Sequence, residues 1–507
     1  MPTAGDFGTE KTVSRTSTSF RNWAGRLFSF PVMCIFLLAP LIVVYAPRGM
    51  GVGEPDIWYR LRSATDFLQH PAFIPIDTYS FTAAGLPWTN FEWLSDLCFL
   101  TAFKIMGLPG IVGVYSAAMM LIVAGIYYRS IRTGADCKDA AIATVGGLCL
   151  AAVSLAPRPL LFGWLCLTGL LLLLDHFRET GRGLWLMPPL FLVWINLHGS
   201  WIYGIAVLVI TILAGTVNGH WGRIVADRWS SADFRKLVTI LIASTAALFG
   251  NPLGYKLVVF PFEYFRIQGF MRYVEYWRPV DFGTWNGKLA LCLIFAILFS
   301  ALFSRRRWRL DEVLLVVFAL WSALFHVRFL DFAAIIIVPV LTPRLKLFPP
   351  YEPELDKRLL NGFIMAAAVV ACIYLFPSSV ELEHRVAADY PVAALQYMHS
   401  HHIQGKIFSP DEFGGFIEWT APEFKSFVDG RAVFVQTAIF DESMRILLLD
   451  NSNELLQKYG IDYVLIEPSW PLNYLLQHSA LWRPVYSDDV ATIFQRLPAP
   501  APGSSVN

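Results

Sequence analysis

Eleven apolar runs constrain the fold of this 507-residue chain more than any other feature. About 20 apolar residues cross a bilayer as a helix, and many such runs are typical of a polytopic membrane protein. Hydrophobic residues make up 55% of the sequence and charged residues 16%, which agrees with that class. Several runs are shorter than a full span, so their helices are expected to extend into flanking polar residues. The predicted spans are residues 27–46, 108–128, 140–156, 160–176, 184–197, 201–217, 237–249, 289–304, 313–326, 329–341 and 360–376.

A shorter apolar segment, residues 93–107, decides the predicted topology. It carries Asp96 and Lys104, and it could be a twelfth span or a helix that lies in the membrane interface. If it lies in the interface, the basic loops fall on the same side as the basic N-terminal tail, as the positive-inside rule requires. If it spans, every one of those loops falls outside. We therefore predict eleven spans, a cytoplasmic N-terminus and an extracytoplasmic C-terminus. The basic residues are Arg129, Arg132, Lys138, Arg178, Arg182, Arg223, Arg228, Arg235, Lys236, the cluster 305–309, Arg344, Lys346, Lys357 and Arg358.

The connection after the first run is unusually long for a loop between two membrane helices. Its residues 53–93 are rich in aromatic and turn-forming side chains and carry several acids. Loops of this length are usually either functional or disordered, and the apolar surface here argues against disorder. With the segment 93–107 it forms a predicted first outer loop over residues 47–107, with interfacial helices that present an acid to a substrate.

The predicted topology brings the remaining polar motifs to the outer face as well. Each of them alone is compatible with an interfacial anchor or a snorkelling charge. Ionisable residues at membrane depth are costly and usually face a cavity or a partner, so their gathering predicts one outward-facing polar cavity. The residues are Asp56, Arg60, Asp77, Glu92, Arg158, Asn196, His198, Glu275, Arg278, His326, Arg328 and Asp331.

The first loop carries a pattern of short motifs that resembles a family. The motifs are Asp56-Ile57-Trp58, then Ile74-Pro75-Ile76-Asp77-Thr78-Tyr79-Ser80-Phe81-Thr82, Gly85-Leu86-Pro87-Trp88 and Glu92-Trp93-Leu94. Later in the chain come Arg158-Pro159, Asn196-Leu197-His198-Gly199 and Asn251-Pro252-Leu253-Gly254. With the many spans, this resembles bacterial membrane glycosyltransferases of the GT-C class, which include protein mannosyltransferases and the aminoarabinose transferase of lipid A. One departure is Arg60, where that group usually has histidine.

The resemblance implies an inverting transfer of a sugar from a polyprenyl-phosphate donor to a lipid, glycan or protein acceptor at the outer face of the cytoplasmic membrane. The acceptor hydroxyl loses a proton as it attacks, and a nearby carboxylate can act as general base. Asp56 is the first candidate, followed by Asp77 and Glu92. Asp56 could instead cap a surface helix.

The leaving lipid phosphate calls for cationic or polar partners, and arginine suits phosphate because of its two-pronged geometry. The candidate substrate-binding residues are Arg60, Arg158, Asn196, His198, Glu275, Arg278, His326 and Arg328. The resemblance leaves metal use open. An acid pair such as Asp56 with Glu54 or Asp77 could hold Mg²⁺ or Mn²⁺, but no ligand spacing here demonstrates it.

The rest of the chain divides into further predicted parts. Residues 1–26 and 498–507 read as tails, residues 27–376 as the GT-C-like membrane domain, and residues 377–497 as a small extracytoplasmic α/β domain. In that domain we expect a helix at 391–400, another within 442–460, strands at 406–408, 426–428, 462–466 and 491–495, and turns at 413–416 and 429–431. It has no glycine-rich nucleotide loop. The net charge of +1 implies no nucleic-acid partner.

Two functions of other classes remain open. The chain could be a transporter or flippase in which the outer polar residues line a substrate path, although no convincing internal repeat is present. It could also be a non-catalytic assembly protein that holds its partners through residues 377–497.

Overall fold

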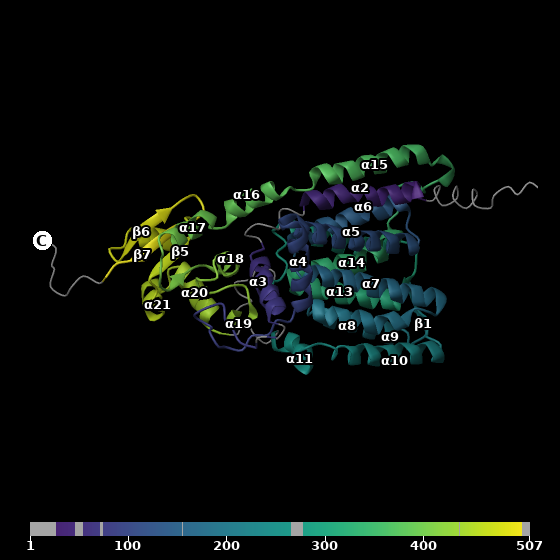
Figure 1. The fold of residues 1–507 in the computed structure, drawn as a ribbon. Coiled ribbons are helices and arrows are strands. Elements are labelled where there is room, and N and C mark those ends of the chain that lie inside the picture. The colour runs from purple at the N-terminus through teal and green to yellow at the C-terminus, as the bar shows by residue number, and fades with distance from the viewer. Residues whose placement is uncertain are drawn as a thin grey trace, which may run out of the picture.

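The computed structural model describes residues 27–45, 54–70, 73, 75–154, 156–264, 277–435 and 437–498. The predicted tail at 1–26, most of the tail at 498–507, and Glu275 lie outside the described residues. The described part is mostly helical, and its long helices run side by side in one bundle (Figure 1).

Each predicted apolar run contains a helix of this bundle. Four of the described helices, α5, α7, α12 and α15, are long and apolar enough to cross a membrane. The helical membrane character is therefore as predicted, whereas the number of eleven spans stays a prediction. The helices of the runs are α2 (Phe30–Tyr45), α5 (Leu108–Arg132), α6 (Cys137–Leu150), α7 (Leu160–Thr180), α8 (Met187–Leu197), α9 (Trp201–Ala214), α10 (Ser231–Ala247), α12 (Trp285–Phe303), α13 (Leu310–Phe325), α14 (Leu330–Leu341) and α15 (Arg358–Leu375). A further helix, α11 (Tyr255–Tyr264), overlaps with none of the predicted runs.

Local sequence signals set the ends and the packing of these helices. The Asp136 side chain accepts a hydrogen bond from the Lys138 amide at the start of α6, and Gly181 ends α7 in the left-handed conformation. Small residues let helices approach closely: a Cβ at Gly125 of α5 would overlap with Thr168 of α7. Short 3₁₀ helices cover Ala151–Ser154, Leu184–Leu186, Val327–Phe329, Thr342–Arg344 and Pro353–Leu355.

The basic loops meet at one end of the bundle, where acids on neighbouring helices pair with them. Arg178 Nη2 lies 2.6 Å from Asp311 Oδ2, and Arg344 Nη2 lies 2.5 Å from Glu312 Oε2. A small three-stranded sheet closes the same end, with the order β1 (Gly219–Trp221), β2 (Ile224–Ala226) and β3 (Trp308–Arg309). This end contains the N-terminus of α13.

Two helices of the first loop lie at the other end, between the bundle and the C-terminal region, which is defined here as residues 379–498 (Figure 1). They are α3 (Asp56–Gln69) and α4 (Trp93–Met106). The Ser95 hydroxyl of α4 donates to the carbonyl of Leu197, 2.5 Å away, where α8 ends. The N-terminal part of α4 is thereby fixed to the end of α8.

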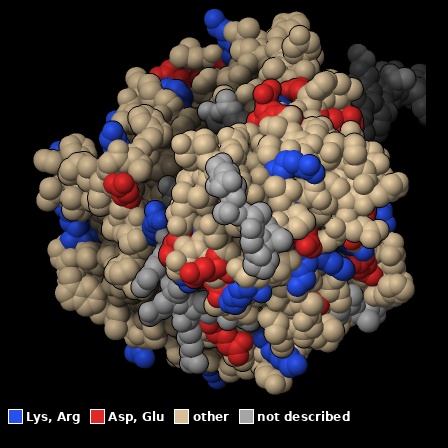
Figure 2. Space-filling view, turned by 90° about the vertical axis from the view of Figure 1, so that its left-hand side faces the viewer, with Lys and Arg blue, Asp and Glu red and all other residues tan. Residues whose placement is uncertain are grey.

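The C-terminal region combines short helices with a four-stranded sheet of order β4-β5-β7-β6, in which only β4 and β5 run parallel. Acidic and basic side chains are interspersed on the face that it presents (Figure 2). Its elements are α16 (Ser379–Asp389), α17 (Val392–Ser400), β4 (Ile407–Phe408), α18 (Asp411–Thr420), α19 (Ala432–Val435), α20 (Ile439–Leu447), α21 (Ser452–Lys458), β5 (Tyr463–Ile466), α22 (Pro471–Gln477), β6 (Trp482–Ser487) and β7 (Thr492–Arg496).

The predicted helix at 391–400, a helix within 442–460 (α21) and the strands at 406–408, 462–466 and 491–495 are present. The strand predicted at 426–428 is wrong, because only Ser426 forms a bridge, and its partner is Ser80 of the first loop. The turn predicted at 413–416 is also wrong: these residues lie inside α18. Its two glycines serve close packing, because a Cβ at Gly414 would overlap with the carbonyl of Val428.

The core of the C-terminal region is shared with the first loop. Tyr79, Ala83 and Trp88 pack in one buried cluster with residues such as Phe427 and Val428. Helix α18 packs against α3, where Gly415 lies against the backbone of Tyr59. The first loop therefore joins the bundle to the C-terminal region, a contact that the sequence patterns did not indicate.

Candidate functional site

A buried group of charged side chains lies where α3 and α4 meet the end of α8. We call it the Arg60 cluster, formed by Arg60, Glu92, Asp96, Asn90 and His198. Arg60 Nη1 lies 2.6 Å from Glu92 Oε2 and 3.2 Å from Asp96 Oδ1. Asn90 donates to the other oxygen of Asp96 at 2.9 Å. Glu92 and Asp96 are four residues apart at the start of α4, so both can reach the same arginine of α3.

His198 completes the cluster as a neutral donor. Its Nδ1 accepts a hydrogen bond from the Ser200 amide at 3.0 Å, so the ring proton belongs on Nε2, which lies 3.2 Å from Glu92 Oε1. Burial, followed by the charges of Arg328 and Arg60, holds the pKa of His198 well below its ordinary value. Burial raises the pKa of Glu92, and the charge of Arg60 opposes that rise.

Asp56 is the first residue of α3, one turn before Arg60. The N-cap position is Pro55, and no side-chain cap is formed there, so the capping role considered for Asp56 is not seen. Burial raises the pKa of Asp56 to about 7, while the charge of Arg60 lowers it and the charge of Asp429 raises it. Gly430 lies so close that a Cβ there would overlap with the Asp56 carboxylate. The C-terminal region thus contributes to the surroundings of Asp56.

More acids gather near Asp56, at the start of α18. Burial, followed by the charge of Glu412, raises the pKa of Asp411 well above its ordinary value, and Asp56 adds to that rise. Among the described residues, no group of three or more His, Cys, Asp or Glu side chains is arranged to hold a metal ion.

A second buried cluster surrounds Arg431, which is 1% exposed. We call it the Arg431 cluster, formed by Arg431, Asp77, Glu418 and Asp429. Arg431 Nη2 lies 2.6 Å from Asp429 Oδ2 and 3.3 Å from Glu418 Oε1, and Nη1 pairs with Asp77. Burial, followed by the charge of Asp429, raises the pKa of Glu418 well above its ordinary value. The cluster ties the first loop to the C-terminal region.

The structure brings some of the predicted site residues together and separates others. Arg60, Glu92 and His198 are in direct contact, and Arg328 is close enough to influence the pKa of both Glu92 and His198. Asp77 belongs to the Arg431 cluster, where Ser80 also binds it through its hydroxyl at 2.6 Å.

The other predicted residues have identifiable local roles. Asn196 accepts a hydrogen bond from the indole of Trp93 at 2.9 Å and thereby helps to hold α4 on α8. Arg158 pairs with the buried Glu54. His326 Nδ1 lies 2.7 Å from the carbonyl oxygen of Trp277, whose ring is covered by Arg328 at 4.1 Å.

Arg278 is exposed, and its carbonyl accepts a hydrogen bond from the Val327 amide at 3.0 Å. It joins the Trp277 segment to the turn between α13 and α14.

Sequence reasoning missed Asp96 as a site residue, and it treated the segment from Asp429 to Arg431 only as a turn. The spacing of Glu92 and Asp96, four residues apart at a helix start, could have pointed to a shared cation. No local pattern predicts that Arg431 reaches Asp77, since 354 positions separate them.

Comparison with known protein families and with proteins of curated function identified no relative of the chain. No family model matches the chain, and no curated protein matches it. The functional assignment therefore rests on the residues of the site itself.

Proposed function

We propose that this chain is a membrane glycosyltransferase of the GT-C kind in the cytoplasmic membrane of a bacterium. It transfers a sugar from a polyprenyl-phosphate-linked donor to a lipid, glycan or protein acceptor at the outer face. The motifs of the first loop support the family, and the apolar helices support the membrane setting. The proposal includes eleven spans with a cytoplasmic N-terminus.

The opposite ends of α13 support the proposed orientation. The helix begins at Leu310, beside the pairs of Arg178 and Arg344, and it ends at Phe325, just before His326. Sixteen helical residues are about 24 Å long, shorter than a hydrocarbon core of about 30 Å, so the proposed span includes flanking residues at the helix ends. The arginine-rich end is the cytoplasmic end by the positive-inside rule, and the Arg60 cluster is then extracytoplasmic.

The observation that carries the catalytic proposal is the environment of Asp56. A carboxylate whose pKa is raised to about 7 is a stronger base than an ordinary aspartate, yet it is still substantially ionised at neutral pH. Arg60, one turn later, keeps that pKa from rising further. Asp56 is thereby suited to accept the proton of an acceptor hydroxyl.

The reaction follows from these roles. The acceptor oxygen attacks the anomeric carbon of the donor while its proton passes to Asp56. The bond from that carbon to the phosphate oxygen breaks, and the polyprenyl phosphate leaves with the bonding electrons, which inverts the anomeric centre. We assign Arg328 to the leaving phosphate, because arginine binds phosphate well, whereas Arg158 is already paired with Glu54. Arg60 is engaged by Glu92 and Asp96, so its role is to position Asp56 and to set its pKa.

A transfer assay with purified protein tests the proposal. Membranes from cells lacking the chain supply acceptors, and polyprenyl-phosphate mannose and polyprenyl-phosphate aminoarabinose serve as donors. The Asp56→Asn variant should lose transfer by roughly 10²–10⁴-fold, the usual contribution of a general base. Asp489→Asn, at an exposed position of the C-terminal region, is the matched control. Size-exclusion chromatography establishes that both variants fold.

The outcomes separate the competing functions. Full transfer by Asp56→Asn would remove Asp56 from the base role, and parallel Asp77→Asn and Glu92→Gln variants would then identify the base. Movement of the lipid-linked sugar across vesicle membranes without transfer would instead favour a transporter. An assembly protein would be favoured if the chain neither transferred nor moved the lipid-linked sugar and if its deletion caused the loss of a partner complex.

A further inference from the structure

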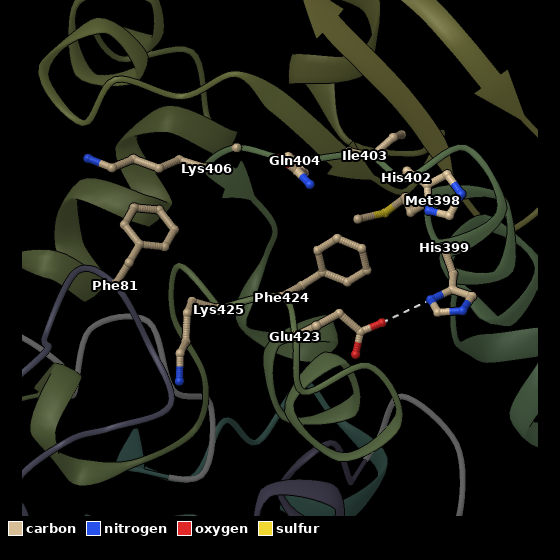
Figure 3. Close-up of a pocket in the computed structure, with 11 residues that line it drawn as sticks. Phe81, Met398, His399, His402, Ile403, Gln404, Lys406, Glu423, Phe424 and Lys425 are labelled. Atoms are coloured by element: carbon tan, nitrogen blue, oxygen red, sulfur yellow. Dashed lines mark hydrogen bonds and ion pairs between the residues drawn. The ribbon is translucent and has the colours of Figure 1, made fainter.

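A pocket of about 480 Å³ opens in the C-terminal region, separate from the Arg60 cluster. It is built by the turn that leads into β4, the segment after α18, and Phe81 of the first loop. Its volume falls in the range of small-ligand sites, which is about 300–1,000 Å³. Figure 3 shows Phe81, Lys406 and Lys425 on one side of the pocket. His399, His402 and Glu423 lie on the other side, and the ring of Phe424 lies between the two sides.

Lys406 and Lys425 give one side of the pocket positive charge, and no ion pair with a carboxylate of the described chain neutralises it. Lys406 Nζ donates to the carbonyl oxygen of Tyr459 at 3.1 Å, and Lys425 Nζ donates to that of Thr78 at 2.5 Å. Neither lysine forms an ion pair with a carboxylate in the described part of the chain. An ammonium group has three donors, so each lysine retains donors for a ligand. The pocket therefore favours an anionic group on this side.

The remainder of the pocket combines apolar surface with the amide of Gln404, two histidines and the carboxylate of Glu423. The half-buried ring of Phe81 has Lys406 Nζ 5.5 Å from its centroid, and the ring of Phe424, which is 9% exposed, lies in the middle of the pocket, so these rings supply its apolar contact surface. Gln404 and the exposed pair of His399 and Glu423, 3.3 Å apart, offer both donors and acceptors. A sugar ring presents this combination of C–H faces and hydroxyl groups.

The turn that forms the floor is held in one conformation before any ligand arrives. His402 has a φ of 49°, which is uncommon for a residue with a side chain, and such strain clusters at functional sites. The Lys406 amide donates to Asp462 Oδ2 at 2.8 Å, and a Cβ at Gly405 would lie 2.6 Å from the same oxygen. A fixed turn lowers the cost of binding, because less conformational entropy is lost.

We propose that this pocket binds an anionic saccharide, one that carries a phosphate or carboxylate group. Lys406 and Lys425 hold the anion, and Phe81 and Phe424 pack against a sugar ring. If the chain is the transferase proposed above, this ligand is part of its acceptor, and that identification rests on the proposed function. The binding itself does not, because it needs neither donor nor Asp56.

Binding to the detergent-solubilised full-length chain tests the proposal by calorimetry. The probes are maltose 1-phosphate, digalacturonate, maltose and inorganic phosphate. We expect saturable binding of the two anionic saccharides, on the order of tenfold or more tighter than either maltose or phosphate alone, because charge-assisted and apolar contacts add. Binding should weaken with salt.

Variants localise the binding to this pocket. Lys406→Gln and Lys425→Gln should each weaken it by on the order of tenfold, and Phe81→Leu should weaken it for the saccharides but not for phosphate. Arg483→Gln, which removes an exposed charge on β6, is the control. No binding of the anionic saccharides, or unchanged affinity in both lysine variants, would overturn the proposal. Equal affinity for phosphate would reduce the pocket to a simple anion site, and equal affinity for maltose would remove the charge requirement.

The proposed transferase function can fail without this proposal. Asp56→Asn should bind the anionic saccharides as the native chain does. Binding without transfer from either donor would leave the pocket in place and remove the enzyme. Transfer without binding of the anionic saccharides would support the enzyme and remove the pocket as a ligand site.

Discussion

Asp56 of α3 lies directly against Gly430 of the C-terminal region, so closely that a Cβ at position 430 would overlap with its carboxylate. The candidate base is therefore enclosed by a segment that is 374 positions away in sequence (430 minus 56). That segment continues into Arg431, which binds Asp77 of the first loop. The C-terminal region thus contributes both to the surroundings of Asp56 and to the anchoring of its loop.

Gly430→Ala should displace the carboxylate of Asp56. The added methyl group overlaps with it, and a misplacement of about 1 Å can cost roughly 10²-fold in rate. The displacement also changes the surroundings that raise the pKa of Asp56, so the acidic limb of the rate profile should move from its native position near pH 7. The measurement is transfer rate against pH. Gly146→Ala, where nothing lies within 4 Å of the added carbon, is the control. An unchanged profile would contradict the proposed contact.

Arg60→Gln should shift the same profile to higher pH. The charge of Arg60 is the main factor that lowers the pKa of Asp56, so its removal raises that pKa above about 7 and moves the acidic limb to higher pH. Arg60→Lys keeps the charge and should leave the limb near its native position. Arg60→Gln also leaves Glu92 and Asp96 without their cation, and this loss should cost about 3–5 kcal/mol of stability. The charge of Arg60 would not be what lowers the pKa of Asp56 if the acidic limb stayed in place in Arg60→Gln. The same would follow if the limb moved as far in Arg60→Lys as in Arg60→Gln.

Much of the bundle could be predicted from sequence, because a long apolar run in a membrane protein forms a helix whatever its tertiary neighbours are. The helices at 108–132 and 160–180 contain the predicted runs, and the spacing of basic loops anticipated that Arg178 and Arg344 meet at one end. The number of spans stays a prediction, since only four of the described helices reach the length and hydropathy of a span.

The candidate site was predictable only in part. The family motifs pointed to Asp56, Glu92 and His198, and the structure places Glu92 and His198 in one buried cluster beside α3. The same motifs pointed to Asp77, which the structure binds to Arg431 instead. That pairing depends on how two distant segments dock, and no local periodicity carries such information. The glycines of α18 were misread for the same reason: they permit a tertiary contact, whereas sequence reasoning treats glycine as a turn signal.

Stability should depend on pH through Asp56. Its pKa is raised from about 3.8 to about 7, so the folded state binds the proton more tightly than the unfolded state. The fold is therefore favoured at low pH and loses stability as pH rises from about 4 through 7, by up to about 4 kcal/mol. Asp56→Asn removes this loss. The variant should unfold at a higher temperature than the native chain at pH 8.5, with a smaller difference at pH 5.5, as measured by thermal unfolding. An equal difference at both pH values would contradict the raised pKa.

Arg431→Met should destabilise the protein strongly, because it leaves three buried carboxylates without their cation. Breaking a buried ion pair typically costs about 3–5 kcal/mol. Adding Asp77→Asn removes one of those carboxylates and should restore part of the stability, as measured by thermal unfolding. Arg385→Met breaks an exposed pair on α16 and should cost less than about 1 kcal/mol. A loss in Arg431→Met no larger than in the control would mean that the Arg431 cluster does not hold the first loop in place.

The two ends of α13 should lie on opposite sides of the membrane. Residues 178–182 cover the end of α7 and the turn after it at the arginine-rich end, and the Arg60 cluster with the C-terminal region lies at the other end. In a variant without native cysteines, Asp489→Cys should react with a membrane-impermeant maleimide in intact spheroplasts, because it is exposed and is extracytoplasmic in the proposed topology. Arg182→Cys, also exposed, should react only after the membrane is permeabilised. The reverse pattern would place the Arg60 cluster in the cytoplasm, where a donor on the outer leaflet is out of reach. Reaction of both cysteines before permeabilisation would show that the helices between them do not separate two compartments.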